Sequence, residues 1–410
     1  MRIAPATRAF TILLALLVAL PSFGIDMSLP ALTATGAALR VPPERVGMMM
    51  SVFMLGFGIA PLLSGPASDR YGRKPVAAFA CALFAVGAIG CALSGSLPAL
   101  LRWRLVEGAG AGASASIPLA IIRDLFDGET ARRKLSNVAI VMLAVPMIAP
   151  LAGVLLLALG GWRAIHALLA AVGLAVVAAV MAGFAESARI DRANRLLPSV
   201  VGRNYLRVLN HPSAIGYVLV NAAAFASLFA YVSGSPLYLI NVAGLQPQQY
   251  GLVFAATSLS IMAGAFLNTR LGAMRVSPDA AIGTGLALAA ASAVSLLLMT
   301  LAGWMPLPPV LALLMAANLA FGLIVPNAMQ RAMEPLPQIA GAAGAVTGCT
   351  QTMAGALSSA LVTGLFDGRS ALSMVAAMSV CALLALAMYG LVVRRREPAR
   401  TFGYERNRIS

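Results

Sequence analysis

Long apolar runs recur along the whole chain, and this recurrence constrains the fold more than any other feature of the sequence. Each run has about the ~20 residues that a helix needs to cross the core of a bilayer. The runs lack the short alternation of a membrane β-barrel, whereas a helix satisfies its own backbone groups in lipid. With 60% hydrophobic and only 10% charged residues, the composition excludes an ordinary soluble domain. We therefore expect an all-α, multi-pass membrane protein.

Pro, Gly and charged residues divide the apolar runs into twelve predicted spans. These fall at about 9–32, 45–66, 75–95, 99–121, 135–157, 164–185, 213–235, 250–270, 279–302, 309–330, 342–364 and 371–393. We keep the first run as an uncleaved helix, because it continues past any plausible signal-peptide cleavage site. The longest polar stretch separates six spans from six. We predict an N-terminal six-helix bundle (1–185), a connector (186–212), a C-terminal six-helix bundle (213–393) and a basic tail (394–410).

The net charge of +15 comes from basic residues that lie in short stretches between the apolar runs. In that position they set membrane topology. If the N-terminus is cytoplasmic, 23 basic residues lie on the cytoplasmic side and five on the opposite side. This asymmetry predicts a protein of the bacterial inner (plasma) membrane with both termini in the cytoplasm. We expect no nucleic-acid partner.

The cysteines and histidines indicate no catalytic chemistry. The four cysteines lie inside apolar segments without CxxC spacing, so we expect buried structural thiols and no metal site. His166, which starts the sixth span, and His211, which precedes Pro212, are expected at the membrane interface. No catalytic triad, HExxH or phosphate-cradling motif is recognisable. We expect neither an enzyme nor an ATP-driven pump, and no cofactor.

The stretch GPASDRYGRKP (65–75) is the most specific motif in the chain. Its glycines permit a tight turn and a close helix approach, and its charges form a cluster at the cytoplasmic face that can hold one conformation closed. The residues concerned are Gly65, Asp69, Arg70, Gly72, Arg73 and Lys74. An ordinary positive-inside loop would not explain this order of residues. The stretch NTRLGAMR (268–275) repeats its Arg-x-Gly after the eighth span, and such repeated halves are typical of secondary transporters.

The motif resembles the signature loop between helices two and three of the major facilitator superfamily. RWRLVEGAGAG (102–112) resembles the fourth-helix motif of its proton-coupled drug exporters, with Arg104 at the position of that motif's arginine. IDMSLPAL, IIRDLFDGETARR and PNAMQRAMEPLPQIAGAAGAV resemble the bicyclomycin and chloramphenicol resistance (Bcr/CflA) branch. The resemblance covers the whole chain and implies a twelve-helix drug:proton antiporter. In such a protein Asp69, Arg73 and Asp124 would latch the outward-facing state.

Two departures from this pattern stand out. The fourth-helix motif usually has glutamine before its glycine, and this chain has Glu107. The fifth helix of such antiporters usually carries a Gly-Pro motif, whereas VPMIAPLAG (145–153) keeps Pro150 and Gly153 but has alanine before Pro150. We still expect the pair Pro146 and Pro150 to bend this helix.

Asp26 is a carboxylate inside the first apolar run. At ~1.5 Å per residue it lies about 9 Å below the outer end of its span, and Arg104 and Glu107 lie about 8 and 12 Å below that end of theirs. Charges inside membrane helices are costly and usually mark pathways, and the resemblance implies that both helices face one cavity. We predict Asp26 as the proton carrier, because apolar surroundings favour a protonated carboxyl group. Arg104 would have to move away from Asp26 during the cycle. The alternatives are Glu107 as the carrier, or a fixed Glu107–Arg104 ion pair.

The second half offers uncharged candidates for the substrate-binding site. They are Asn221, Phe225, Phe229 and Tyr231 on the seventh span, Asn327 on the tenth and Gln351 on the eleventh. The aromatic stripe could equally be helix packing, and the amides could equally be interhelical hydrogen bonds.

We therefore predict a monomeric secondary transporter that exports small, drug-like compounds in exchange for protons and contacts membrane lipid. A proton-coupled transporter of an endogenous metabolite with the same fold is the alternative. A membrane-embedded enzyme or a solute sensor is disfavoured, because neither a catalytic constellation nor a soluble output domain is visible.

Overall fold

The computed structural model describes residues 4–5, 7–183, 185–187 and 198–393, and in these ranges the backbone is almost entirely helical, without a β-strand. The first half contains α1 (Arg8–Asp26), η1 (Leu29–Ala31), α2 (Leu32–Leu39), α3 (Pro43–Tyr71), α4 (Arg73–Ala92), α5 (Leu97–Leu125) and α6 (Gly128–Gly183). The second half contains α7 (Pro198–Leu209), α8 (Pro212–Asn241), α9 (Pro247–Ala273), α10 (Pro278–Leu301), α11 (Leu307–Met333), η2 (Pro337–Ile339), α12 (Ala340–Gly364), α13 (Leu372–Met388) and η3 (Tyr389–Val393).

Ten stretches of the described chain are long and apolar enough to cross a membrane. One of them, α6, has 56 residues. As a straight helix it would extend about 84 Å, more than twice the thickness of a bilayer core. Its backbone leaves the helical conformation at Gly160 and at Gly161, whose φ of +71° favours glycine. The bend divides α6 into two spans, and α12, whose 25 residues are richer in Gly, Ser and Thr, supplies the twelfth. The predicted all-α fold with twelve membrane-length helices is confirmed.

The first span is broken directly after Asp26. Pro30 has no backbone N–H to donate to a helical hydrogen bond, and the chain passes through η1 before α2 begins. Helix α6 packs closely against this break, because a side chain at Gly153 of α6 would meet the carbonyl oxygen of Met27. Asp26 is therefore the last residue of α1. It lies next to an interruption of the α-helix and not within a continuous helix.

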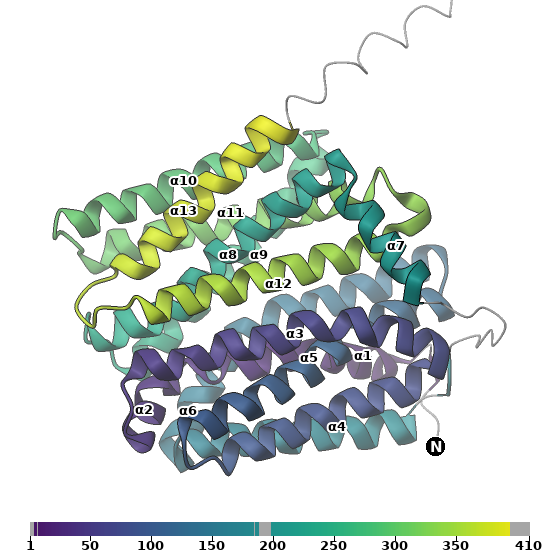
Figure 1. The fold of residues 1–410 in the computed structure, drawn as a ribbon, viewed down its shortest axis with the longest axis horizontal. Helices are drawn as coiled ribbons and strands as arrows, with labels where there is room; N and C mark the ends of the chain where they lie inside the picture. Colours follow the sequence, from purple (N-terminus) through teal and green to yellow (C-terminus); the bar gives the residue numbers. More distant parts are fainter. Residues whose placement is uncertain (1–3, 6, 184, 188–197, 394–410) are drawn as a thin grey trace, which may run out of the picture.

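The two halves repeat the same packing. In the first half α5 packs against α1, α3 and α4, and in the second half α11 packs against α8, α9 and α10. Likewise α4 packs against α6, as α10 packs against α13. Figure 1 shows the result as two layers, one purple to blue and the other green to yellow. The fold is a pair of six-helix bundles, called the first and second bundle below.

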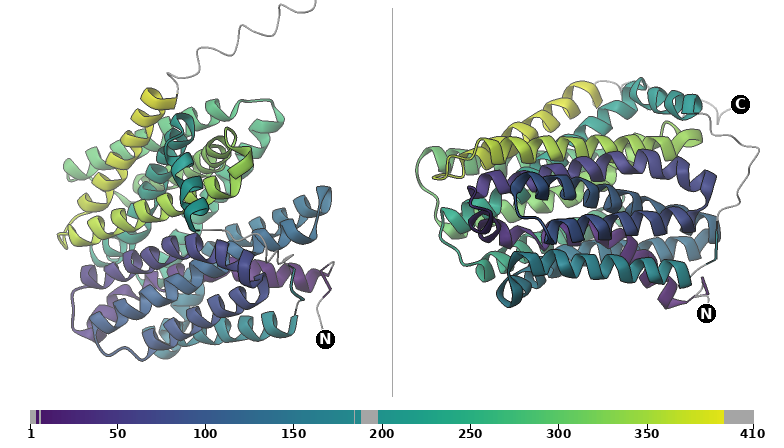
Figure 2. Two further views of the ribbon diagram at one scale, coloured as in Figure 1. Left: turned by 45° about the vertical axis from the view of Figure 1, so that its right-hand side comes forward. Right: turned by 60° about the horizontal axis from the view of Figure 1, so that its bottom comes forward.

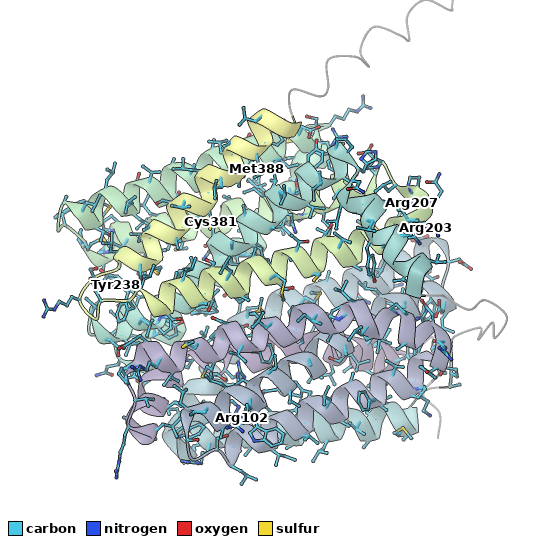
Figure 3. All side chains as sticks on the ribbon, in the orientation of Figure 1. Arg102, Arg203, Arg207, Tyr238, Cys381 and Met388 are labelled. Atoms are coloured by element: carbon cyan, nitrogen blue, oxygen red, sulfur yellow. The ribbon has the colours of Figure 1, made fainter. Side chains whose placement is uncertain are left out.

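The bundles meet along two helix pairs, α3 with α12 and α6 with α9. Figure 1 and both views of Figure 2 show α3 and α12 side by side along the boundary. The helices run between two ends of the molecule. We name these the Gly72 end, which holds the α3–α4 turn and α7, and the Pro42 end, which holds α2. Figure 3 shows Arg203 and Arg207 at the first of these ends and Tyr238 at the second.

The bundles hold each other more tightly at the Pro42 end. There the Thr33 hydroxyl donates to the Asn241 side-chain oxygen across the boundary at 2.8 Å. A side chain at Gly47 would lie 2.6 Å from that of Thr363. Toward the Gly72 end α6 has few packing neighbours: along residues 128–142 only Val138 is buried. The boundary is therefore closed at the Pro42 end and looser at the Gly72 end.

The connector between the bundles holds a helix of its own. Within 186–212 the chain forms α7, and Val208 of α7 packs with Ala343 and Val346 of α12. The predicted basic tail (394–410) and part of the connector (188–197) lie outside the described residues.

Candidate functional site

A buried ion pair lies inside the first bundle. Arg104 and Glu107 of α5 are both 0% exposed, and Arg104 Nη1 lies 3.0 Å from Glu107 Oε2. The same Nη1 donates to the Gly24 carbonyl of α1 at 3.0 Å. The guanidinium carbon also lies 4.4 Å from the centre of the Phe53 ring on α3. Arg104 thus binds its neighbour on one helix face and ties α5 to α1 and α3.

Glycines let the backbone of α5 approach its neighbours at this level. Side chains at Gly108 and Gly112 would meet the carbonyl oxygens of Phe53 and Phe57 on α3. A side chain at Gly110 would meet the backbone of Phe84 on α4. The Gly-Ala-Gly-Ala-Gly run therefore places α5 in the centre of the bundle. From there the long side chain of Arg104 reaches the backbone of α1.

Glu107 also faces α4 and α6. Cys91 Sγ lies 3.4 Å, and His166 Nδ1 4.0 Å, from Glu107 Oε2. Glu107 Oε1 and His166 Nδ1 are buried and have no hydrogen-bond partner among the described residues. His166 is only 2% exposed, so its side chain lies inside the bundle, and its position at the membrane interface stays a prediction. The bend at Gly161 starts the second half of α6 before the predicted boundary, which places His166 more than one turn inside the bundle.

The donor atoms of Cys91, Glu107 and His166 lie within 4.8 Å of one another. Thiolate, carboxylate and imidazole together suit a zinc-like cation. However, the Arg104 guanidinium already donates to the same Glu107 oxygen, and a metal ion there would face this positive charge. We assign no metal to this cluster.

Asp26 lies at the boundary between the bundles, apart from the ion pair. It is 7% exposed and makes no hydrogen bond or ion pair with any residue in the described part of the chain. Its carboxyl group interacts electrostatically with the hydroxyl groups of Tyr231 on α8 and Tyr250 on α9. The Tyr231 hydroxyl is itself 2.6 Å from Thr257 Oγ1. Asp26 is thus a buried, unpaired carboxyl group that faces the second bundle.

The charged motif at the Gly72 end forms a compact cluster around Arg73. Its Nη1 lies 2.5 Å from Asp69 Oδ1, its Nε donates to Asp124 Oδ2 at 2.9 Å, and Nη1 also donates to the Ser68 hydroxyl at 2.6 Å. These contacts join the ends of α3, α4 and α5, all in the first bundle. In the described chain every ion pair that we find lies within one bundle, so this cluster does not bridge the two.

The other residues of the motif differ in their surroundings. Gly72 has a φ of +101°, and a side chain there would meet the Glu186 carboxylate, which accepts from the Arg73 and Lys74 backbone N–H groups at 2.7 and 3.1 Å. The Lys74 ammonium donates to the Met181 carbonyl. Arg70 is exposed and lies over the Tyr71 ring, and a side chain at Gly65 would meet no atom within 4 Å. The sequence did not single out Glu186, because it lies in the connector, 112 residues from Lys74.

The predicted helix-bend residues lie in the first half of α6. Pro146 and Pro150 are inside the helix, and the non-helical dihedrals of α6 occur only at Gly160 and Gly161. Gly153 serves the close contact with Met27. A bend at the prolines therefore stays a prediction.

The substrate-binding candidates fall into three separate places. Asn221 donates to the Gln351 side-chain oxygen at 2.6 Å, and Phe225 stacks on Phe229 at 4.8 Å between ring centres. These four face one another across α8 and α12. Tyr231 faces α9 and Asp26 instead, as described above. Asn327 donates to the Asn268 side-chain oxygen at 2.6 Å, near the Gly72 end.

A second charged cluster, which the sequence did not single out, lies at the Gly72 end of the second bundle. Asp279 at the start of α10 pairs with Arg331 near the end of α11. The Tyr217 hydroxyl donates to Asp279 Oδ1 at 2.7 Å, and the Tyr389 hydroxyl donates to the Asp279 carbonyl at 2.8 Å. The repeat of the bundles could have pointed to this pair, because α10 and α11 correspond to α4 and α5.

Comparisons with known proteins agree with this architecture. Residues 14–363 match the family model described as Major Facilitator Superfamily. The chain is 27% identical over 397 residues to a "Bicyclomycin resistance protein homolog" of Haemophilus influenzae, covering 96% of this chain and 98% of that protein. It is 28% identical over 247 residues to the "Multidrug resistance protein MdtL" of Shigella dysenteriae, covering 59% and 61%.

Solved structures share the fold. A bacterial homolog of the human lysosomal transporter Spinster superposes with a TM-score of 0.74 at 15% identity, covering 95% of this chain and 98% of that one. The xylose transporter XylE of Escherichia coli gives a TM-score of 0.71 at 16% identity, covering 94% and 98%. At this identity the likeness establishes the fold alone.

Proposed function

The chain belongs to the Major Facilitator Superfamily and is therefore a membrane transporter of small molecules rather than an enzyme, and we propose that it exports drug-like compounds across the bacterial inner membrane in exchange for protons. The likeness to a bicyclomycin resistance protein homolog over almost the whole chain supports the export of drugs. The buried carboxyl group of Asp26 supports the exchange for protons.

Asp26 carries the proposal, because its position suits a group that binds and releases a proton. It faces the second bundle at the closed end of the boundary, and no cation of the described residues pairs with it. An unpaired carboxylate is costly away from water, so Asp26 is protonated while the boundary is closed around it. When the boundary opens to water or to a substrate, the proton leaves. Proton and substrate then compete for one conformational equilibrium, which is what coupling requires.

We place the Gly72 end in the cytoplasm. The excess of basic residues in the segments at this end supports that orientation, which puts both termini on the cytoplasmic side. The looser boundary at this end then corresponds to an inward-facing arrangement. The cluster of Asp69, Arg73 and Asp124 would be the latch that holds this end shut in the outward-facing state.

The substrate would lie between Asp26 and the second bundle. Asn221 and Gln351 supply amide groups, and the buried Asn221 Oδ1 has no hydrogen-bond partner in the described chain. Phe225 and Phe229 supply an aromatic wall on the same face of α8. Neutral donors and aromatic rings suit small, partly apolar compounds.

The outer faces support contact with membrane lipid. A hollow of about 560 Å³ opens between α3, α4 and α5 and has an almost wholly apolar lining that includes the exposed Leu63 and Phe79. Lipid chains would fill it. The alternative function, a proton-coupled transporter of an endogenous metabolite, would use the same groups with a different compound.

The test is proton flux in everted membrane vesicles that hold the protein and are energised with lactate. Compounds from a drug panel are added after the pH gradient has formed, with vesicles from cells lacking the protein as the control. If the proposal is right, at least one compound dissipates the gradient only where the protein is present. If no drug does so but an endogenous metabolite does, the metabolite transporter replaces the drug exporter. If no compound moves protons, the coupling itself is refuted.

A further inference from the structure

A buried group of hydroxyls in the second bundle faces the Asp26 carboxyl group, and the proposed cycle does not use it. We infer that Tyr231 of α8 recognises the proton on Asp26: its hydroxyl oxygen accepts a hydrogen bond from the protonated carboxyl group, so that the boundary closes at the Pro42 end only when the proton is bound. This inference rests on the proposed proton coupling and adds a positioning residue to it.

The hydroxyl groups lie on α8 and α9 and come together at the boundary. Tyr231 Oη lies 2.6 Å from Thr257 Oγ1, and Ser235 Oγ lies 3.2 Å from Tyr250 Oη. All four residues are buried. The carboxyl group of Asp26 interacts electrostatically with both tyrosines, and η1, which follows α1, packs against α8 and α9. The carboxyl group of one bundle is thus opposed by hydroxyl groups of the other.

The direction of the hydrogen bond at Tyr231 follows from its partner Thr257. A hydroxyl group has one proton to donate, and the Thr257 hydroxyl donates that proton to the Phe254 carbonyl at 2.9 Å. In the 2.6 Å contact Tyr231 is therefore the donor and Thr257 the acceptor. Because its own proton is committed to Thr257, the Tyr231 oxygen can only accept from a further partner. Ser235 also contacts this hydroxyl, and it has a proton of its own to donate.

An acceptor selects the protonated form of Asp26. A protonated carboxyl group can donate a hydrogen bond, whereas an ionised carboxylate can only accept. The Tyr231 oxygen therefore suits the neutral form of Asp26 and repels the ionised form. A buried carboxylate without a partner is costly in any case, and the orientation of Tyr231 adds to that cost. The second bundle thus distinguishes the two forms of the carboxyl group.

A proton requirement of this kind makes closure depend on pH. The closed boundary holds one proton more than the open one, so acidification favours closure at the Pro42 end and alkaline pH favours opening. The other hydrogen bond across the boundary at this end joins Thr33 and Asn241, which are both uncharged. That bond does not respond to pH by itself. The contact of Asp26 with Tyr231 would be the pH-sensitive one.

The charged groups of the neighbouring helices leave Asp26 to the tyrosines. Helix α8 carries no charged residue, and Arg270 of α9 lies at the Gly72 end. On the other elements, the charged or titratable residues toward the Pro42 end are Arg40 of α2, Glu44 and Arg45 of α3, Arg102, Arg104 and Glu107 of α5, and Arg163 and His166 of α6. In the described chain none of them forms an ion pair or hydrogen bond with Asp26.

The test measures closure of the Pro42 end against pH. Spin labels are attached through Ala38→Cys on α2 and Ala243→Cys after α8, two exposed positions on opposite sides of the boundary. Cys349→Ala and Cys381→Ala remove the partly exposed thiols, and the other two cysteines are buried. Double electron–electron resonance gives the distance between the labels in the purified full chain over a series of pH values.

We expect the short distance to gain population on acidification, in a single transition. Tyr231→Phe removes the acceptor and should shift the transition to lower pH by about 1–2 units, because it leaves a buried donor unsatisfied. Thr257→Val frees the Tyr231 proton for donation to an ionised Asp26, so the transition should shift to higher pH. Asp26→Asn should keep this end closed at every pH, because its amide N–H always donates.

The controls separate hydrogen bonding from packing. Thr257→Ser keeps the hydroxyl group, and Tyr238→Phe alters a tyrosine at the same end of α8 that has no electrostatic interaction with Asp26 (Figure 3). Both should leave the transition unchanged. Shifts of Tyr231→Phe and Thr257→Val in the same direction, or no shift in either, would overturn the inference. A shift in Tyr250→Phe alone would also overturn it. If Thr257→Val does not fold, Thr257→Ala frees the same proton.

Proton flux separates this inference from the function on which it rests. In everted vesicles Tyr231→Phe should retain substrate-driven proton flux with its optimum displaced to lower pH. If the wild type shows flux that Asp26→Asn abolishes, but Tyr231→Phe and Thr257→Val leave the distance transition in place, the role of Tyr231 alone is refuted. If the wild type shows no flux with any compound, the proposed function is refuted.

Discussion

The two bundles have the same packing scheme but differ in the polar side chains that their central helices bury. In the first bundle α5 buries Arg104 and Glu107 at the centre, with His166 beside them, and Asp26 is buried at the boundary with the second bundle. In the second bundle the corresponding helix α11 buries only amides, Asn318 and Asn327. One architecture thus accepts either a charged or a neutral polar core. Under the proposed function, the proton chemistry would belong to the first bundle and the second would supply an uncharged wall.

The charged clusters at the Gly72 end extend the comparison. In the first bundle the cation Arg73 begins α4 and the anion Asp124 lies at the end of α5. In the second bundle the anion Asp279 begins α10 and the cation Arg331 lies near the end of α11. The two pairs occupy equivalent places with exchanged signs. What the repeat preserves is therefore an ion pair at this turn, not the identity of its residues.

Loss of Arg104 should have the largest effect on stability. Arg104→Met leaves Glu107 buried without its cation, which costs about 3–5 kcal/mol. Arg104→Met/Glu107→Leu should recover most of this stability, although not the proton coupling. Thermal unfolding in detergent measures both variants, with Asn318→Leu in the second bundle as the control, which should cost little. If Arg104→Met is no worse than Asn318→Leu, the bundles do not differ in the energetics of their interiors.

Exchange of the paired charges tests whether the sign is interchangeable. Arg73→Asp and Asp124→Arg should each cost about 1.5–3 kcal/mol, as expected for hydrogen bonds to charged groups. The double exchange should recover little, because Asp69 and Ser68 also bind Arg73 and would face an aspartate. The double exchange Asp279→Arg/Arg331→Asp should recover more, since Tyr217 can accept as well as donate and Glu334, the second anionic partner of Arg331, is mostly exposed to solvent. Equal recovery in both bundles would contradict a latch built specifically around Arg73.

Gly108→Ala tests the close packing that lets α5 carry its charges. The added methyl group would meet the Phe53 carbonyl of α3, and overpacking of this kind costs about 1–3 kcal/mol. Gly348→Ala on α12 is the control, because a side chain there meets no atom within 4 Å. It should be neutral or slightly stabilising in the same unfolding measurement. Equal unfolding temperatures for the two variants would show that α5 can move aside.

The amide pair of the second bundle should give the smallest effect. A double-mutant cycle of Asn221→Ala and Gln351→Ala should show a coupling of about 0.6 kcal/mol, the average for such bonds between membrane helices. Substrate affinity, measured on the same variants, should fall more than stability does. Unchanged affinity would remove both residues from the substrate-binding site.

The helices could be predicted from hydropathy because lipid selects for apolar runs. Their ends could not: α3 continues to Tyr71, beyond the predicted limit of 66, because the polar residues after the span remain helical until Gly72 requires a positive φ. Hydropathy reports where lipid ends, not where a helix ends.

The site could be predicted only where its contacts are local. Arg104 and Glu107 are three residues apart, so the spacing on one helix face already indicated their pairing. The approach of His166 to Glu107 and of Glu186 to the backbone of Arg73 joins residues far apart in sequence. Such contacts depend on the bend of α6 and on the packing of four helices, which one sequence does not specify.

The central claim is that proton coupling belongs to the buried carboxyl group of Asp26, and the most direct test compares it with an aspartate of the second bundle. Substrate-driven proton flux is measured in everted vesicles with Asp26→Asn and with Asp279→Asn, at equal amounts of folded protein. We predict that Asp26→Asn abolishes the flux while substrate still binds, and that Asp279→Asn retains it. Flux that survives in Asp26→Asn would contradict the claim and make Glu107 the candidate proton carrier.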